Sequence, residues 1–323
     1  MSNLHKRGLH DVKGRENPLY SALKERGRLR SLVELVKNDD NITLEIRDNY
    51  INIYYQGGNV AKITSPNKVE LDKNYFRQYE DIQKEDWSDI DNKEKEIINL
   101  FMHGKFKEYI KEVKTKMLNY WENVLKNKGV EEKKTQHQIC LCNAFGKSDY
   151  TQLDVEYEVS RKSSFKYSGR RRTPTGKIPS PRFDIIAVRN KDHRLCIIEL
   201  KKGTGALSNK SGVQEHAESY HNTIGKDAKT RKAFLDEMQG ILEIKKKLKI
   251  LPDNIDIDKN LDPEFLFAYQ YSSSDGKHPT EESQKNNFLY YQNNTAYKLD
   301  DVNHAKGIKV LWLKEGDYTL IDN

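Results

Sequence analysis

Phe183-Asp184-Ile185-Ile186-Ala187-Val188 and Cys196-Ile197-Ile198-Glu199-Leu200-Lys201 are two short apolar segments that carry charged residues. Segments of this kind are typical of strands that are buried on both faces of a sheet. A charged side chain in such a strand costs several kcal/mol of desolvation unless it is paired or bound to a metal ion. Asp184, Glu199 and Lys201 therefore call for a common explanation.

The polar residues 189–194 between the two segments predict a hairpin loop. A hairpin there lays Asp184 beside Glu199, and the strand period of two places Glu199 and Lys201 on the same side. We therefore expect two carboxylates and an amine to converge on one point. In the absence of a metal ion, removing one of the two acids should relieve their repulsion and leave the fold intact or more stable. A structural ion pair between Glu199 and Lys201 is the alternative explanation.

This constellation resembles the PD-(D/E)XK nuclease superfamily. The matching residues are Phe183-Asp184 and Glu199-Leu200-Lys201. Phe183 stands where the family pattern has proline, and Pro181 lies two positions earlier. The departure is minor because the proline carries no chemistry. The resemblance covers roughly residues 130 to 275.

The resemblance implies a metal-dependent nuclease that hydrolyses phosphodiester bonds, with DNA as the expected substrate. It implies Mg²⁺, or Mn²⁺, as the cofactor, bound by Asp184, Glu199 and the backbone carbonyl of Leu200. Oxygen ligands of this kind are those that Mg²⁺ prefers. Lys201 would then lie against the scissile phosphate as the third catalytic residue. The alternative is a nucleic-acid-binding or scaffold protein with the same fold and no catalytic activity.

Three further residues are weaker candidates. Glu158 ends the preceding predicted strand and is a possible fourth metal ligand, although an exposed strand glutamate is the simpler interpretation. Gln214 and His216 lie on the predicted helix after the second motif strand. RecB-type nucleases carry a glutamine and a tyrosine on that helix with three residues between them, whereas five residues separate Gln214 from Tyr220, so we do not transfer that motif. His216 is a candidate for contact with phosphate or a metal-bound water, and a plain polar helix face is the alternative.

The segment from Val159 to Arg182 contains no acidic residue. Its basic residues are Arg161, Lys162, Lys166, Arg170, Arg171, Arg172, Lys177 and Arg182. Positive charge beside a carboxylate site predicts contacts with nucleic-acid phosphates. A solvated loop is the alternative.

The predicted elements indicate an α+β or α/β fold. From residue 131 the expected order is helix, three strands, helix, an additional helix at 227–249, and a strand at 265–269. That order is the one described for the restriction-endonuclease-like core, a mixed sheet flanked by helices. We predict three regions: a disordered segment 1–16, an N-terminal region 17–128 with a helix, a β-meander and long helices, and a nuclease-like domain 129–323. In the second region, Asn17 before Pro18 predicts the capped start of a helix that runs to about Lys37. Gly104 predicts a break or kink in the long helical stretch 89–128. The role of region 17–128 is not identifiable from its sequence.

The composition excludes several classes of protein. Three cysteines are too few for a disulfide framework, and Cys140 and Cys142 are too close for the usual zinc spacing. No apolar run has the length of a membrane span. We therefore expect a soluble, cytoplasmic protein that binds no membrane. The basic segment and the resemblance lead us to expect nucleic acid as its partner. The apolar stripe of the predicted helix 89–128 is either core or a contact with a second copy in a homodimer.

Overall fold

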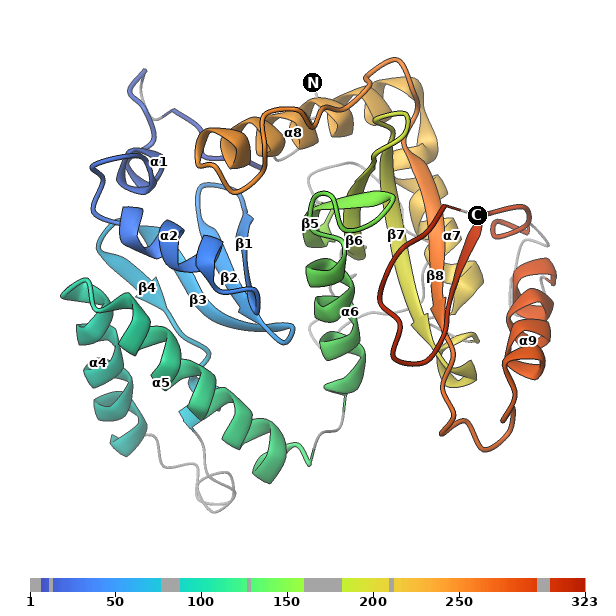
Figure 1. Ribbon diagram of the computed structural model, residues 1–323, viewed down its shortest axis with the longest axis horizontal. Coiled ribbons are helices and arrows are strands. Elements are labelled where there is room, and N and C mark those ends of the chain that lie inside the picture. The colour runs from blue at the N-terminus through green and yellow to red at the C-terminus, as the bar shows by residue number, and fades with distance from the viewer. Residues whose placement is uncertain are drawn as a thin grey trace. The chain divides into compact units, whose positions relative to one another are not determined.

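The computed structural model describes residues 7–11, 14–76, 88–126, 129–159, 182–208, 212–294 and 303–322. They form a mixed α/β structure that contains a 4-stranded sheet and a 5-stranded sheet (Figure 1). The chain divides into two compact units. We call Arg7–Leu141 with Gly240–Asp253 the N-terminal unit, and Cys142–Gln239 with Asn254–Asn323 the C-terminal unit.

The C-terminal unit is built on the 5-stranded sheet. Its strands are β5 (Tyr150–Glu158), β6 (Arg182–Arg189), β7 (Leu195–Lys202), β8 (Glu264–Gln270) and β9 (Val310–Leu313). They lie side by side in sequence order. β5, β6 and β7 pair antiparallel, whereas β7, β8 and β9 pair parallel. The mixed sheet and its helices confirm the predicted α+β class.

Two helices cover the face of β7 and β8 that carries Glu199 and Lys201. In the parallel register Glu199 lies opposite Phe267 and Lys201 lies opposite Tyr269, so these four side chains share a face. Phe288 of α9 (Glu281–Asn293) contacts both aromatic rings, with centroid distances of 5.6 Å to Phe267 and 5.2 Å to Tyr269. The other helix on this face is α7 (Val213–Asn222), described below.

Helix α9 has no counterpart among the predicted elements. Its sequence is mostly polar and shows no apolar stripe, so periodicity does not reveal it. Its start is nevertheless encoded locally. The Thr280 side chain accepts a hydrogen bond from the Ser283 N–H, and the Ser283 side chain accepts one from the Thr280 N–H, which is a capping box.

The N-terminal unit contains the predicted β-meander. Its strands are β1 (Ile42–Ile46), β2 (Ile51–Tyr55), β3 (Gly58–Ser65) and β4 (Lys68–Glu70), each antiparallel to the next. Its helices are α1 (Pro18–Leu23), α2 (Arg30–Asn38), α4 (Ser88–Met102), α5 (Phe106–Asn119) and α6 (Glu131–Cys142). The Tyr109 hydroxyl of α5 donates to the Val60 carbonyl of β3 at 3.2 Å, which fixes α5 on the sheet.

The helix predicted from Asn17 to Lys37 is in fact two helices, α1 and α2. The predicted cap is confirmed, because the Asn17 side chain accepts the N–H groups of Leu19 and Tyr20. The chain turns at Arg26, whose φ is 65°, and at Gly27, where a Cβ atom would collide with the Ala22 carbonyl. The break in the predicted helix 89–128 is confirmed at Gly104, whose φ is 72°.

Disorder was predicted for residues 1–16, but residues 7–11 are ordered. Gly8 forms a bridge with Asp48, and its N–H donates to the Arg47 carbonyl at 3.1 Å. Leu9 is buried at 7% exposure. The prediction of disorder was based on the polar composition of the segment. Backbone hydrogen bonds do not depend on apolar side chains, so composition gave no sign of these pairings.

The compact units also differ from the predicted boundary at residues 128 and 129. Helix α6 belongs to the N-terminal unit except for its last residue, and so does the second part of α8 (Ala228–Lys247). Within that unit the Lys245 ammonium lies 2.8 Å from the Glu45 carboxylate of β1, and both side chains are at most 3% exposed. A buried ion pair between distant segments leaves no periodic signal in the sequence.

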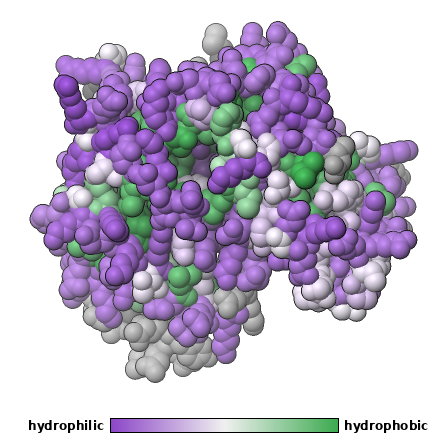
Figure 2. Space-filling model, viewed as in Figure 1, coloured by the Kyte–Doolittle hydropathy of each residue, from purple (hydrophilic) through white to green (hydrophobic). Residues whose placement is uncertain are grey.

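The face of the molecule shown in Figure 2 is largely hydrophilic. This agrees with the high content of charged residues, 33%. Among the helices of the described ranges, none combines the length and the apolar composition that crossing a bilayer requires.

Gly57→Ala is expected to destabilise the N-terminal unit by about 1–3 kcal/mol. Gly57 has a φ of 80°, and a Cβ atom there would collide with the backbone carbonyl of Lys133. Urea unfolding measures the loss. Gly240→Ala is the matched control, because no atom lies within 4 Å of its added Cβ and helix propensity favours alanine by up to about 1 kcal/mol. Equal unfolding midpoints for the two variants would contradict the close packing at Gly57.

Candidate active site

The two motif strands form the predicted hairpin. β6 and β7 pair from Val188 opposite Leu195 to Ile185 opposite Ile198. At the closed end, the Arg189 guanidinium donates to Asp192 at 2.7 and 2.9 Å and to Glu264 at 2.6 Å. These charge-assisted bonds fix the loop and tie it to the neighbouring strand β8.

Asp184 lies where the backbone ladder of the hairpin ends. Its Oδ2 accepts the N–H of Leu200 at 2.8 Å, across the two strands. A side-chain carboxylate thus takes the place of a backbone acceptor at the open end of the hairpin. The bond places Asp184 directly beside the segment that carries Glu199 and Lys201, as the hairpin predicted.

Glu199 and Lys201 form an ion pair in the interior. Both side chains are only 2% exposed, and the Lys201 ammonium lies 2.9 Å from Glu199 Oε1. Their predicted position on the same side of β7 is therefore confirmed. The ion pair that the alternative explanation expects is also present, so the remaining contacts of Glu199 decide between the two interpretations.

The structure adds His216 to this pair. Its Nδ1 lies 2.7 Å from the same Oε1 atom of Glu199. A carboxylate oxygen only accepts hydrogen bonds, so Nδ1 carries the proton in this contact. The second oxygen, Oε2, is buried and has no hydrogen-bond partner among the described residues. Within the described part of the chain, Glu199 therefore has one oxygen with two partners and one with none.

Glu199 is an anion in this environment. Burial raises its pKa, but the charges and hydrogen bonds of His216 and Lys201 outweigh that effect and lower the pKa to about 2. The expectation that two repelling acids destabilise the site is therefore wrong for Glu199. Its charge is compensated, and Glu199→Ala would leave the Lys201 ammonium buried without this partner, which is destabilising.

The contribution of Glu199 to stability should depend on pH. Its pKa in the folded state lies below its usual value of 4.5, so the contribution is complete above pH 4.5 and is lost as the pH falls towards 2. The shift corresponds to about 3 kcal/mol. Urea unfolding of wild type and Glu199→Gln at pH 7 and pH 3 should show their difference shrinking by more than half. A difference that does not change with pH would contradict the compensated anion.

Gln214 anchors helix α7. Its amide nitrogen donates to the carbonyls of Tyr291 and Gln292 and to the Asn303 side chain at 2.8–3.0 Å. Its amide oxygen accepts the N–H groups of His304 and Ala305. The side chain is thus fully engaged within the protein, and the structure gives it a role in holding α7.

The other sequence candidates lie differently. Glu158 is exposed at the end of β5, opposite Arg182 in the register. The Arg182 guanidinium contacts Glu156 at 2.5 Å. Of the basic segment, Arg161, Lys162, Lys166, Arg170, Arg171, Arg172 and Lys177 lie outside the described residues.

Glu156 of β5 is an acidic residue near Asp184 that its sequence pattern does not single out. In the register of β5 and β6 it falls opposite Asp184, between the pairs Val155 with Ile185 and Tyr157 with Phe183. Its φ of 52° is unusual for a strand residue other than glycine. Apolar and acidic residues alternate regularly over 153–159, which predicts a straight strand and gives no sign of this kink. Strand periodicity puts Glu156 and Glu158 on the same side of β5, and only the register with β6 shows that Glu156 is the one opposite Asp184.

The donor set is suited to a hard divalent cation. Within the described ranges, no group of three or more histidine, cysteine, aspartate or glutamate side chains is arranged as a metal centre. Because only two carboxylates of the described residues are available, a cation site here would need a backbone oxygen as its third ligand. It would combine the Asp184 and Glu199 carboxylates with the Leu200 carbonyl. The buried Oε2 of Glu199 fits this set, because it is an anionic oxygen that accepts no hydrogen bond from the described residues.

Comparison with known proteins adds no relative to this description. The resemblance to the PD-(D/E)XK superfamily therefore remains an expectation from the sequence motif Phe183-Asp184 and Glu199-Leu200-Lys201. No protein-family model, curated protein or solved structure matches this chain.

Proposed function

We propose that this protein is a metal-dependent nuclease of the restriction-endonuclease-like type, with Asp184, Glu199 and Lys201 as its catalytic residues. The observation that carries the proposal is the buried Oε2 of Glu199, which has no hydrogen-bond partner among the described residues. Glu199 lies beside Lys201, and Asp184 binds the N–H of Leu200 between them. A purely structural ion pair explains Oε1 but leaves Oε2 without a hydrogen bond from any described residue. Leaving a buried carboxylate oxygen unsatisfied is costly, and such costs are concentrated at functional sites.

Phosphodiester hydrolysis forms a bond from water to phosphorus and breaks the bond to the leaving oxygen. In the proposed site the Asp184 and Glu199 carboxylates and the Leu200 carbonyl would hold Mg²⁺ or Mn²⁺. When bound, the cation supplies positive charge beside the phosphate and lowers the pKa of water. The bond from Leu200 N–H to Asp184 fixes the orientation of the carboxylate relative to β7. The positive charge of Lys201 stabilises the phosphoryl oxygens as they gain negative charge.

The alternative proposal is a protein with this fold that binds nucleic acid or acts as a scaffold without catalysis. It is favoured by the close pairing of Lys201 with Glu199, which a structural role also produces. The basic residues between Val159 and Arg182 support nucleic acid as the partner in both proposals.

A cleavage assay distinguishes the two proposals. The purified full chain is incubated with linear, circular and single-stranded DNA, and with RNA, in the presence of Mg²⁺, Mn²⁺ or EDTA. The nuclease proposal predicts cleavage of at least one substrate that EDTA abolishes and added Mn²⁺ restores. Binding of nucleic acid without cleavage under all these conditions would favour the alternative.

A further inference from the structure

His216 makes a contact that the catalytic triplet alone does not explain. Its Nδ1 shares Glu199 Oε1 with the Lys201 ammonium, at 2.7 and 2.9 Å. Two donors on one oxygen of a carboxylate restrict the rotation of the whole group. The rotation that is selected leaves Oε2 as the oxygen that no described residue contacts by a hydrogen bond.

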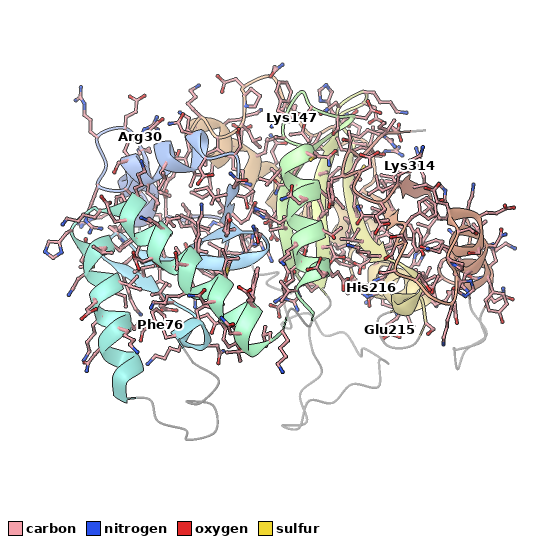
Figure 3. The ribbon with its side chains drawn as sticks, turned by 60° about the horizontal axis from the view of Figure 1, so that its bottom comes forward. Arg30, Phe76, Lys147, Glu215, His216 and Lys314 are labelled. Carbon is pink, nitrogen blue, oxygen red and sulfur yellow. The ribbon has the colours of Figure 1, made fainter. Side chains whose placement is uncertain are left out.

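The position of His216 is fixed by α7, which is held near both ends. The Gln214 hydrogen bonds described above anchor its first turn. In its last turn, the Tyr220 hydroxyl donates to the Pro263 carbonyl at 3.0 Å, and its ring stacks on Phe265 at 4.9 Å between centroids. Figure 3 shows His216 and Glu215 next to each other at the beginning of this helix. The imidazole is thus supplied by a rigid element, as an accurately placed contact requires.

We infer that His216 is a positioning residue that orients Glu199 so that Oε2 is presented to a divalent cation. This inference rests on the proposed metal site. Residues that hydrogen-bond to a metal-binding group typically alter metal affinity or activity by 10- to 100-fold when they are removed. Lys201 alone is a poorer constraint, because its flexible stem and rotatable ammonium fix no single direction.

The test is a calorimetric titration of the full-length protein with Mn²⁺, in the absence of nucleic acid. His216→Ala should weaken Mn²⁺ binding by roughly 10- to 100-fold. His216→Asn and His216→Gln each retain an N–H donor, and the better placed of the two should recover much of the affinity. His221→Ala is the matched control, because His221 lies on the same helix and contacts the His304 carbonyl instead of Glu199. It should bind Mn²⁺ as the wild type does.

A cleavage assay on the same variants adds a second measurement. Loss of positioning should lower kcat at saturating Mn²⁺ while the KM for nucleic acid stays near the wild-type value. Wild-type Mn²⁺ affinity in His216→Ala, or equal losses in His216→Ala, Asn and Gln, would overturn the inference. If His216→Ala does not fold, the Mn²⁺ affinities of His216→Asn and His216→Gln are compared with that of His221→Ala. Wild-type affinity in both His216 variants, or equal losses in both, would then overturn the inference. Unchanged Mn²⁺ binding in Glu199→Gln would instead overturn the proposed metal site itself.

Discussion

Asp184→Asn is expected to reduce the rate of metal-dependent cleavage by about 100- to 1,000-fold. Enzymes lose about this much in kcat when one group that stabilises charge in the transition state is removed. Asparagine keeps an oxygen that can accept the Leu200 N–H, so the open end of the hairpin should remain intact. What is lost is the negative charge that a divalent cation needs. The measurement is the cleavage rate at saturating Mg²⁺, together with circular dichroism to verify the fold.

Asp236→Asn is the control for this result. Asp236 pairs with Lys259 at 2.8 Å in an exposed ion pair of the same unit. Its replacement removes an equal charge away from the hairpin and should leave the cleavage rate unchanged. A folded Asp184→Asn protein with the wild-type rate would exclude Asp184 from catalysis.

Glu45→Ala is expected to destabilise the N-terminal unit by about 3–5 kcal/mol, because it removes the carboxylate that lies 2.8 Å from the buried Lys245 ammonium. The ammonium then loses the carboxylate that compensates the cost of its desolvation. The double substitution Glu45→Leu with Lys245→Met should be close to wild type or more stable, since both charges leave the interior together. Urea unfolding measures both variants.

Asp253→Ala provides the matched control. Asp253 pairs with Lys249 at the same distance, 2.8 Å, but both side chains are more than half exposed. Solvent screens such a pair, so its loss should leave the unfolding midpoint near that of the wild type. A Glu45→Ala protein as stable as Asp253→Ala would show that the buried pair contributes little.

The sequence was informative where a local pattern fixes the structure. The two apolar motif strands and the polar loop between them predicted the hairpin, and the strand period predicted the contact of Glu199 with Lys201. Asn17 before Pro18 predicted a helix start, and Gly104 predicted a break. Each of these depends on residues that are close in the chain.

The sequence was uninformative where the structure depends on tertiary contacts. His216 contacts Glu199 from α7, a helix that Gln214 and Tyr220 anchor through tertiary hydrogen bonds with no pattern in the sequence. The expectation of repulsion between Asp184 and Glu199 did not include the contact of His216 with Glu199, which lowers the pKa of Glu199 together with Lys201. Glu156 was passed over because the register that sets it opposite Asp184 is not visible in one strand alone.

The most direct test of the proposed function is an experimental structure of the protein with Mn²⁺, using the anomalous signal to locate the ion. The proposal predicts anomalous density between the Asp184 and Glu199 carboxylates, in contact with Glu199 Oε2, and no such density in Glu199→Gln. At an Mn²⁺ concentration that saturates the cleavage assay, the absence of density there would contradict the account. So would the same density in Glu199→Gln.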